Sequence, residues 1–503
     1  METADELILA LDEGTSSAKA FLFDSQGRIH GEGRCPFTQH YPQPGWVEHD
    51  PFEIWTAMQT AIHQALREGR ITPRDIDAIG ITNQRETALL WDRDSGRPLY
   101  NAIVWQDRRT APAIEHLDNE QRAMIQEKTG LIPDAYFSAS KLQWLLDKLP
   151  KARHKAEVGE LACGTIDSWL IWQLTNGAVH ATDCSNAART MLYDIHQCTW
   201  DNELLELFNV PEQLLPEAHD CSHTYGHATI DGIQIPITGC AGDQQAALFG
   251  QRCTTPGMVK NTYGTGNFIL MCMEHPCQSN QLLSTIAWSI DGSVTYALEG
   301  SVFATGAGIQ WLQTLGLLDN LREIEALAAS IKNTDGVYLV PAFVGLGAPY
   351  WDATARGTLI GLSSGTDRAT LARATLEAIT YLSQDVIEAM ETNAGTQVQQ
   401  MRVDGGGSSN DFLLQFQADI SRHTVLRPQI METTALGAAM LAGLAADVWN
   451  SQHELNELWK EDTRYEPRME PHHRDALYHG WKQAVARAGG WTTALEQRGH
   501  DDS

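Results

Sequence analysis

The sequence predicts an α/β protein of two lobes, and three observations support this fold class. The chain has 503 residues, which is enough for two domains or one large two-lobed unit. Short apolar runs of strand length alternate with stretches of helical period. A strand, Gly-Thr turn, strand pattern occurs twice, at residues 7–23 and 258–273. Such self-similarity suggests two halves of common architecture, with a nucleotide between them.

The first of these patterns opens the chain. Residues 7–11 form an apolar run, a turn of small residues follows at 12–17, and a second apolar run covers 18–23. The turn is dense in backbone N–H groups and hydroxyls and carries little bulk, as a loop around phosphate oxygens requires. Taken alone it is a weak signal, because Gly-Thr-Ser-Ser also forms ordinary hairpins.

A polar cluster follows the next predicted strand. A helix is expected at residues 52–67 and a strand at 76–81, and the strand ends in Thr82–Thr87, which contains Arg85 and Glu86. An adjacent cation and carboxylate usually form a solvated ion pair. At a strand end that faces a ligand, the two groups can instead hold neighbouring hydroxyls of a small polyol from two sides.

Two aromatic residues extend this hypothesis. Trp105 lies at a strand-to-helix junction and offers a flat apolar wall, while Tyr136 is a candidate hydroxyl donor on a loop. An amphipathic tyrosine at the surface is an equally good interpretation of Tyr136. Further along, residues 164–172 predict a buried helix, and residues 181–192 predict a polar connection.

Asp243 is the candidate catalytic residue. It follows an apolar run at 235–237 and precedes a helix-like run at 244–249, so it lies on a turn between a strand and a helix. The N–H groups of a helix N-terminus favour anions. Asp243 can therefore take a proton from a substrate hydroxyl while a phosphate lies nearby. The alternative is that Asp243 only caps the helix, but the two Gly-Thr hairpins favour the catalytic role.

The second half carries further turns of small residues. A Gly-Thr turn lies within residues 261–267, small residues recur at 300–311, and apolar residues at 371–391 follow the helical period. A glycine-rich turn at 405–410 opens a predicted helix at 411–420. Such a turn can admit a flat ring or a phosphate.

The C-terminal part predicts helices that pack on the body of the protein. Residues 435–446 are rich in Ala and Gly and predict a tightly packed core helix. From Leu455 onward the chain is charged, and Trp481 and Trp491 suggest docked helices. No zinc-binding or EF-hand spacing of ligand residues occurs in the sequence.

Composition excludes several classes of function. The chain has 36 Lys plus Arg and 64 Asp plus Glu, a formal net charge of −28, which argues against nucleic acid or anionic membrane as partner. No apolar run approaches the ~20 residues that span a bilayer, and we expect no signal peptide. Nine scattered cysteines without a Cys-x-x-Cys pair indicate reduced thiols of a cytoplasmic protein.

At this point the motifs, taken together, resemble a known family. Their order and register from about residue 7 to about residue 450 are similar to those of the carbohydrate kinases named for a Phe-Gly-Gly-Tyr (FGGY) signature. Gly-Trp-Val-Glu-His-Asp-Pro, Asn-Gln-Arg-Glu-Thr and Gly-Leu-Gly-Ala-Pro-Tyr-Trp-Asp indicate the bacterial glycerol kinase branch. The matching segments are 11–15, 45–51, 82–87, 104–109, 242–250, 261–266, 345–352 and 403–406.

The resemblance implies a fold and an activity. The fold is two actin-like (ribonuclease H-like) lobes, each a mixed β-sheet flanked by helices, with an ATP and substrate cleft between them. We expect the lobes at residues 1–252 and 253–503. The implied activity is transfer of the γ-phosphoryl group of Mg-ATP to the 3-hydroxyl of glycerol, and a homodimer or homotetramer is common in the family.

The resemblance also implies roles for individual residues. Asp243 accepts the proton of the attacking hydroxyl, and Asp12 and Asp243 hold Mg²⁺ through water. The residues implied to contact glycerol are Arg85, Glu86, Trp105, Tyr136, Asp243, Gln244 and Phe268. Those implied to contact ATP are Thr15, Ser16, Ser17, Lys19, Thr265, Gly306, Gln310, Gly406 and Asn410.

Some features depart from the family pattern, and two other functions stay open. Glu13 and Lys19 stand where Gln and Arg are usual, and Glu13 is expected to add negative charge beside the metal. Residues 229–235 lack the basic glycine-rich loop that binds a regulatory sugar bisphosphate in some members, so we expect that regulation to be absent.

The alternatives to glycerol phosphorylation are a kinase of another small polyol or ketose, and an actin-like ATPase without an acceptor.

Overall fold

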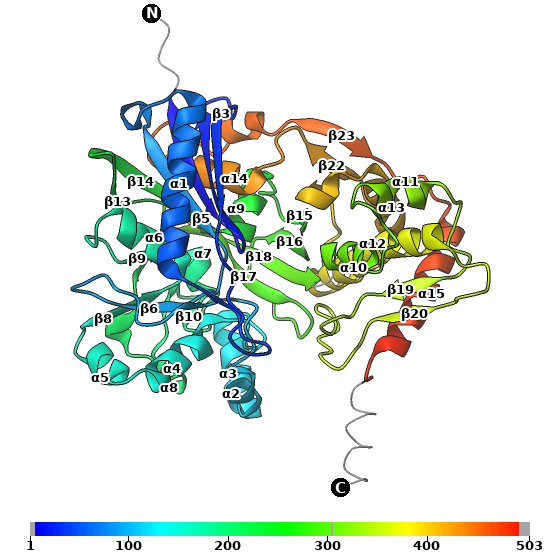
Figure 1. Cartoon of the computed structure of the whole chain (residues 1–503), viewed down its shortest axis with the longest axis horizontal. Helices are drawn as coiled ribbons and strands as arrows, with labels where there is room; N and C mark the ends of the chain where they lie inside the picture. The colour runs from blue at the N-terminus through cyan, green and yellow to red at the C-terminus, as the bar shows by residue number, and fades with distance from the viewer. Residues whose placement is uncertain (1–5, 265, 303–304, 492–503) are drawn as a thin grey trace, which may run out of the picture.

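The computed structural model describes residues 6–264, 266–302 and 305–491 (Figure 1). These residues form an α/β protein organised around one sheet of thirteen strands. In spatial order the strands are β23 (Glu461–Tyr465), β22 (Val425–Pro428), β21 (Gln400–Asp404), β15 (Met258–Tyr263), β16 (Asn267–Met273), β18 (Ser293–Val302), β17 (Leu283–Ile290), β13 (Ser222–Ile230), β14 (Ile233–Gly242), β5 (Ala78–Asn83), β1 (Leu7–Glu13), β2 (Ser17–Asp24) and β3 (Ile29–Pro36).

The first half of the sheet brings the predicted acceptor residues to one edge. Strands β1, β5 and β14 run parallel, with Glu13 and Gly242 both opposite Asn83. Because the carboxyl ends of parallel strands share one edge, the residues just beyond them meet there. Asp12, Arg85 and Asp243 therefore lie on the same side of the sheet.

The second half repeats this arrangement. β15 pairs antiparallel with β16 and parallel with β21, as β1 pairs with β2 and β5. Both predicted hairpins are confirmed. The two halves are joined within one sheet where β17 meets β13, with Ile290 opposite Ser222.

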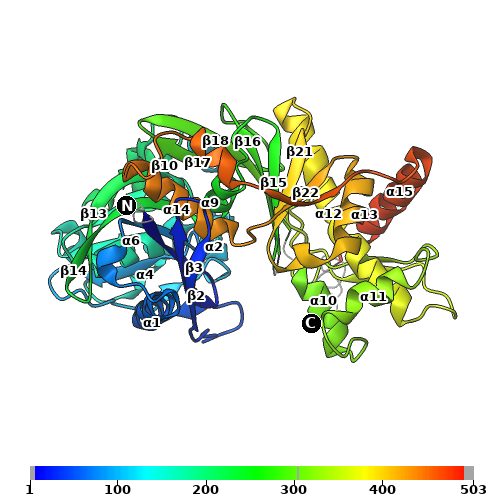
Figure 2. The same cartoon turned by 90° about the horizontal axis from the view of Figure 1, so that it is seen from above.

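Helices cover the first half of the sheet. α1 (Pro51–Gly69) packs on β2 and β3, and Asp50 caps its N-terminus by accepting from the Phe52 N–H at 2.8 Å. α14 (Thr433–Ala445) returns from the second half and packs on α9 (Asp243–Gly250) and on β5 and β14 (Figure 2). The approach is close: a Cβ at Gly437 would lie 1.8 Å from the Ala246 carbonyl oxygen. This explains the Ala and Gly content of the segment.

The second half is covered by α12 (Arg368–Ala394), α13 (Asp411–Ser421) and α15 (Pro471–Ala488). The predicted helices at 371–391 and 411–420 are confirmed. Trp481 of α15 is fully buried and donates to Asp385 of α12 at 2.7 Å. The prediction for Trp491 is wrong: α15 ends at Ala488, and Trp491 is 56% exposed.

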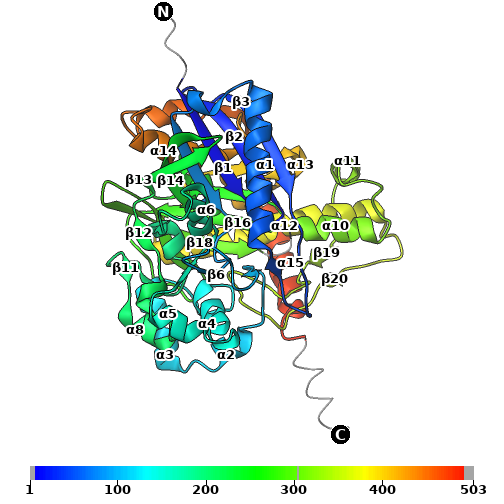
Figure 3. The same ribbon diagram turned by 60° about the vertical axis from the view of Figure 1, so that its left-hand side comes forward.

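Other elements surround these layers, and several small helices gather beside the first half of the sheet (Figure 3). The remaining helices are α2 (Ala111–Glu115), α3 (Asn119–Thr129), α4 (Ser138–Lys148), α5 (Ala152–Glu157), α6 (Ile166–Leu174), α7 (Cys184–Ala187), α8 (Asn202–Leu207), α10 (Gly306–Thr314) and α11 (Glu323–Ala329). The small sheets pair β4 (Glu48–His49) with β7 (Ala102–Ile103), β6 (Leu89–Asp92) with β8 (Leu161–Gly164), β9 (Ala181–Asp183) with β12 (Glu217–His219), β10 (Tyr193–Asp194) with β11 (Thr199–Trp200), and β19 (Tyr338–Val340) with β20 (Thr358–Ile360).

One predicted connection is a buried structural element instead. Residues 181–192 were expected to form a polar connection, but they form β9, α7 and a buried turn. Their buried polar side chains have hydrogen-bond partners: Asn186 donates to Asp183 at 2.7 Å and to Asn83 of β5 at 3.0 Å, and Thr182 donates to Asp167 of α6 at 2.6 Å. The nine cysteines are all free, as expected. Within the described ranges, no helix has the length and apolarity that crossing a membrane requires.

Candidate active site

Arg85 lies at the centre of the residues predicted to contact the hydroxyls of the substrate that accepts the phosphoryl group. We call these residues the acceptor end of the site. It follows β5, and its guanidinium makes two parallel bonds with Glu299 of β18: Nη1 to Oε2 at 2.6 Å and Nη2 to Oε1 at 3.0 Å. Its Nε lies 3.3 Å from Oδ1 of Asp243, and its Nη2 lies 3.5 Å from the hydroxyl of Tyr136. A bidentate pair fixes the plane of a guanidinium. Arg85 is therefore held with its Nε edge toward Asp243.

Glu86 is fixed by a second arginine. Arg189, which follows α7, donates from Nε to Glu86 Oε1 at 2.6 Å and from Nη2 to Glu299 Oε1 at 2.9 Å. The backbone of Glu86 is left-handed, with φ of 62°, and its carbonyl accepts from Ser138 at 3.1 Å. Such backbone conformations are uncommon outside glycine and cluster at functional sites. The chain thus turns sharply to present Glu86.

Asp243 lies at the start of α9, and it is not the N-cap, which is Gly242. Its carboxylate accepts from the Gln244 N–H at 2.7 Å and keeps 27% of the side chain exposed. Burial of its surroundings raises the pKa of Asp243 to about 6, although the charge of Arg85 opposes this shift. A carboxylate that titrates near neutral pH is suited to general-base catalysis.

Three aromatic rings stand beside these polar groups. Trp105 packs edge-on against Tyr136, with centroids 5.7 Å apart, and against Phe268, with centroids 6.2 Å apart. Phe268 lies on β16, in the second half of the sheet. Burial raises the pKa of Tyr136, which keeps its hydroxyl protonated as a donor. The three rings thus lie together, and both halves of the sheet contribute to the group.

Lys260 joins the site through Gln244. Its ammonium group donates to Gln244 Oε1 and to Thr262 Oγ1, the latter at 2.8 Å. Burial lowers the pKa of Lys260 to about 8. The sequence analysis did not single out Lys260, although a lysine inside the otherwise uncharged strand 258–263 is a signal for a functional or buried cation.

The first hairpin turn offers groups for an anion. Thr15 and Ser16 form its tip, and Ser16 is exposed. The hydroxyls of Thr15 and Ser17 already have partners: Trp105 Nε1 donates to Thr15 at 3.0 Å, and Arg34 Nε lies 3.3 Å from Ser17. The turn is therefore anchored on Trp105, and the exposed Ser16 can contact a ligand.

The predicted nucleotide residues of the second half lie on α10, in the turn after β21 and at the start of α13. Gly306 begins α10 and Gln310 is exposed on that helix. Gly406 is exposed in the turn after β21, and Asn410 caps α13 by accepting from the Leu413 N–H at 2.8 Å. Thr265 lies outside the described residues.

Carboxylates gather where the metal was predicted. Asp12 and Asp243 are close enough that the negative charge of Asp12 raises the pKa of Asp243. Asp12 also lies 3.3 Å from the ammonium group of Lys19. Carboxylate oxygens are the ligands that Mg²⁺ takes in phosphoryl-transfer sites, so this donor set fits the ion.

Glu13 is buried at the end of β1, next to Asp12. Its side chain is fully buried, Oε1 accepts from Gln84 at 2.9 Å, and Oε2 has no partner among the described residues. Burial raises its pKa well above the ordinary range, which favours the neutral acid. The expected effect of Glu13 on the metal stays a prediction.

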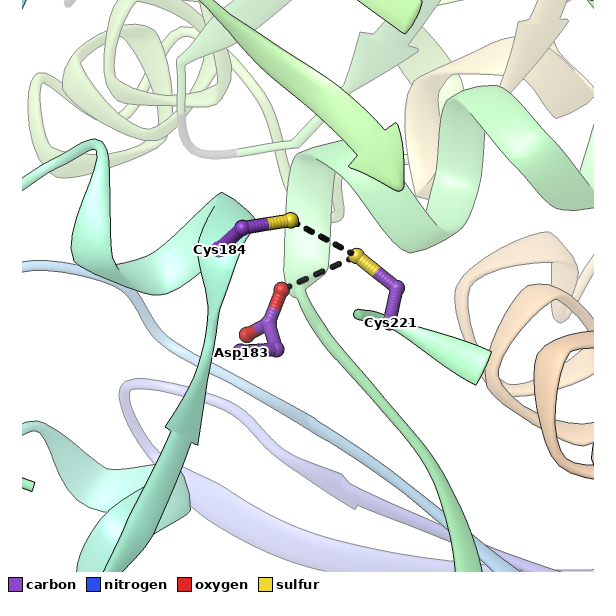
Figure 4. Close-up of side chains that lie close together, drawn as sticks. All are labelled: Asp183, Cys184 and Cys221. Carbon is purple, nitrogen blue, oxygen red and sulfur yellow. Dashed lines mark hydrogen bonds between the residues drawn. The ribbon is translucent and has the colours of Figure 1, made fainter. Parts of the chain in front are cut away.

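A buried cluster of acids and thiols lies behind the Asp243 turn. Asp183, Cys184 and Cys221 point toward one another, with Cys221 Sγ 3.1 Å from Asp183 and 3.7 Å from Cys184 Sγ (Figure 4). Asp183 also accepts from the backbone of Ser185 at 2.7 Å as the cap of α7. The hydroxyl of Ser185 in turn accepts from the Gly242 N–H at 3.0 Å. The cluster therefore anchors the turn that presents Asp243.

Comparison with known proteins gives the family. Residues 7–250 match the N-terminal domain, and residues 259–446 the C-terminal domain, of the FGGY family of carbohydrate kinases. The chain belongs to this family. A glycerol kinase of Thermococcus kodakarensis is 55% identical over 98% of this chain and 99% of its own length. A glycerol kinase of Deinococcus radiodurans is 54% identical over 97% of this chain and 98% of its own length.

The solved structures confirm the predicted two-lobed carbohydrate kinase fold. The crystal structure of Plasmodium falciparum glycerol kinase with ADP superposes with a TM-score of 0.89, at 35% identity, over 96% of this chain and 98% of that one. The predicted division at residues 252 and 253 falls between the two matched FGGY domains, and it stays a prediction. The roles of the individual site residues also stay predictions.

Two charged residues of this carbohydrate kinase, Arg189 and Glu299, were not predicted from the sequence to belong to the site. Arg189 lies between Ala188 and Thr190 in a stretch that was interpreted as a polar connection, and Glu299 lies within the mostly apolar strand 293–302. A charged residue surrounded by small or apolar neighbours was the available signal. Their partners are distant in sequence, so only the fold reveals the contacts.

Proposed function

We propose that the protein transfers the γ-phosphoryl group of Mg-ATP to the 3-hydroxyl of glycerol, giving sn-glycerol 3-phosphate. The observation that carries this proposal is the convergence of Arg85, Glu86 and Tyr136 beside Asp243. These groups offer donors and acceptors on several sides of a small polyol. The full-length similarity to glycerol kinases supports the same acceptor.

Asp243 acts as the general base. Its raised pKa, about 6, leaves it ionised at neutral pH and still able to take a proton from a hydroxyl. Phosphoryl transfer has a loose transition state, so the protein mainly positions the reactants and stabilises charge. Asp243 accordingly orients the attacking oxygen as well as receiving its proton.

The other acceptor residues divide the hydroxyls between them. Arg85 and Tyr136 donate to hydroxyl oxygens, and Glu86 accepts from a hydroxyl hydrogen. Gln244 lies beside Asp243, held by Lys260. Trp105 and Phe268 cover the carbon chain and exclude water, which matters because hydrolysis of ATP competes with transfer.

The turns of the two hairpins would bind the phosphates, and Asp12 and Asp243 would hold Mg²⁺. When bound, Mg²⁺ neutralises charge on the transferred phosphoryl group. Lys19 lies beside Asp12 and adds a positive charge to this end of the site. The residues proposed to contact ATP are Thr15, Ser16, Ser17, Lys19, Thr265, Gly306, Gln310, Gly406 and Asn410.

The cellular setting follows from the same proposal. We place the enzyme in the cytoplasm, where ATP and Mg²⁺ are available and where its free cysteines stay reduced.

We expect a homodimer or homotetramer, and light scattering on the purified protein measures this oligomeric state. The lobes are residues 1–252 and 253–503.

The test is ADP release from Mg-ATP by the purified protein with glycerol, dihydroxyacetone, erythritol, xylulose or no acceptor. We expect a strong preference for glycerol and glycerol 3-phosphate as the product. Preference for a longer acceptor would reassign the substrate while keeping the base. Equal ADP release with and without acceptors would overturn the kinase assignment in favour of an ATPase.

A further inference from the structure

Four charged side chains behind the acceptor residues form a closed and buried ring. Arg85 bonds to Glu299, Glu299 to Arg189, and Arg189 to Glu86, while Arg85 Nε lies 3.7 Å from Glu86 Oε1. None of these four side chains is more than 1% exposed. The ring holds two positive and two negative charges, so its net charge is zero.

Stability alone does not explain such a ring. Removing charges from water is costly, and apolar residues of similar volume often give equal or greater stability than a buried ion pair. The two arginines are nevertheless strongly engaged: burial alone would raise the pKa of Glu299, but Arg189 and Arg85 lower it to about 2. Glu299 is therefore a fixed anion between two fixed cations, which suggests a role in positioning.

The bonds within the ring fix how Arg85 and Glu86 are oriented. Glu299 occupies Nη1 and Nη2 of Arg85, so the Nε edge is turned toward Asp243. Arg189 occupies Oε1 of Glu86, and Oε2 of Glu86 has no hydrogen-bond partner among the residues described. The orientation of each of these two residues is thus set by a charged partner from the ring.

We propose that Arg189 and Glu299 are positioning residues for the acceptor: Glu299 orients the Arg85 guanidinium, and Arg189 orients the Glu86 carboxylate. Neither is assigned a contact with the polyol or with ATP. Glu299 lies on β18 of the second half, whereas the other three ring members belong to the first half. The orientation of the acceptor residues therefore depends on both halves. This inference rests on the proposed function, because Arg85 and Glu86 are the residues proposed there to contact glycerol.

The test compares Glu299→Gln and Arg189→Lys with the wild type, each with KM for glycerol, KM for ATP and kcat. Glutamine keeps the shape of glutamate but turns a donor toward one guanidinium nitrogen, and lysine keeps the charge but has no fork. We expect KM for glycerol to rise at least about tenfold in both variants while KM for ATP changes less than about twofold. Glu377→Gln breaks a largely buried pair away from the site, Arg373 to Glu377 at 2.7 Å, whose side chains are 13% and 4% exposed, and serves as the control.

Further variants separate positioning from folding. Glu299→Asp keeps the charge and shortens the reach, so it should also raise KM for glycerol if Glu299→Gln does not fold. The double variant Arg189→Met with Glu299→Gln removes one charge of each sign. Its rise in KM for glycerol should be smaller than the product of the rises measured for Arg189→Met alone and for Glu299→Gln alone. Thermal unfolding is recorded for every variant.

The measurements distinguish failure of the positioning role from failure of the proposed function. A KM for glycerol within about twofold of wild type, or equal losses for glycerol and ATP, would overturn the positioning role. Failure of the proposed function gives another pattern, because the wild type itself would then show no glycerol-dependent ADP release. If another polyol is the acceptor, the same KM comparison is made with that polyol.

Discussion

The two ends of the site are built in different ways. At the acceptor end, Arg85 and Glu86 are buried and bonded to charged partners on both sides. At the phosphate end, Ser16, Gln310 and Gly406 are exposed on turns or on a helix surface. The acceptor end is therefore organised before any ligand arrives, whereas the phosphate end depends on backbone groups at turns. We therefore expect different mutations to change the selectivity for the phosphoryl acceptor and the affinity for nucleotide.

The largest expected effect is at Asp243, where the two ends meet. Asp243→Asn removes the base and leaves the shape of the side chain, so turnover should fall by about 10²–10⁴-fold. ATP affinity, measured by titration calorimetry, should change little. The control is Asp231→Asn, an exposed carboxylate 3.2 Å from His63. Near-normal turnover in Asp243→Asn would show that Asp243 only helps to begin the helix.

The second effect is on pH dependence, and it also reports on Asp243. Its raised pKa means that the carboxyl gains a proton as the pH falls through about 6 and then no longer acts as a base. Below that pH, kcat/KM for glycerol should fall about tenfold per unit. The profile is measured between pH 4.5 and 8, with Asp243→Asn as control. A flat profile down to pH 5 would contradict the assignment.

A smaller effect is expected at the phosphate end. Lys19 lies 3.3 Å from Asp12 and 3.4 Å from Glu432 and is partly exposed. Because exposed charges are screened, Lys19→Ala should raise KM for ATP by only about three- to tenfold and leave KM for glycerol unchanged. Lys155→Ala, which also loses two carboxylate partners, is the control. A larger change in KM for glycerol would break the separation of the two ends.

The smallest effect concerns stability at Glu13. Its pKa is raised by burial, so the folded state binds the proton more tightly than the unfolded chain. Stability is then complete below the unfolded pKa and decreases as the pH rises toward the folded pKa. Glu13→Gln removes this dependence, and its melting temperature should exceed that of the wild type by a margin that grows between pH 5 and 8. A constant margin would indicate that Glu13 is ionised.

Much of this arrangement could be predicted from sequence because it is local. The two hairpins, the Asp243 turn and the helix at 371–391 each follow from a run of neighbouring residues. The ring could not be predicted in the same way, since Arg85 and Glu299 are 214 positions apart and Arg189 and Glu299 are 110 apart. Sheet register brings them together. The prediction for Trp491 was wrong because the sequence around an aromatic residue near a terminus does not indicate whether that residue is buried.

The most direct test of this account is titration of glycerol into the nucleotide-free protein by calorimetry. Because the acceptor end is organised by buried charges, we predict saturable binding at one site per chain without ATP, and binding at least about tenfold weaker in Glu299→Gln. Binding that occurs only after a nucleotide is added would contradict the account, since the acceptor end would then be assembled by the nucleotide.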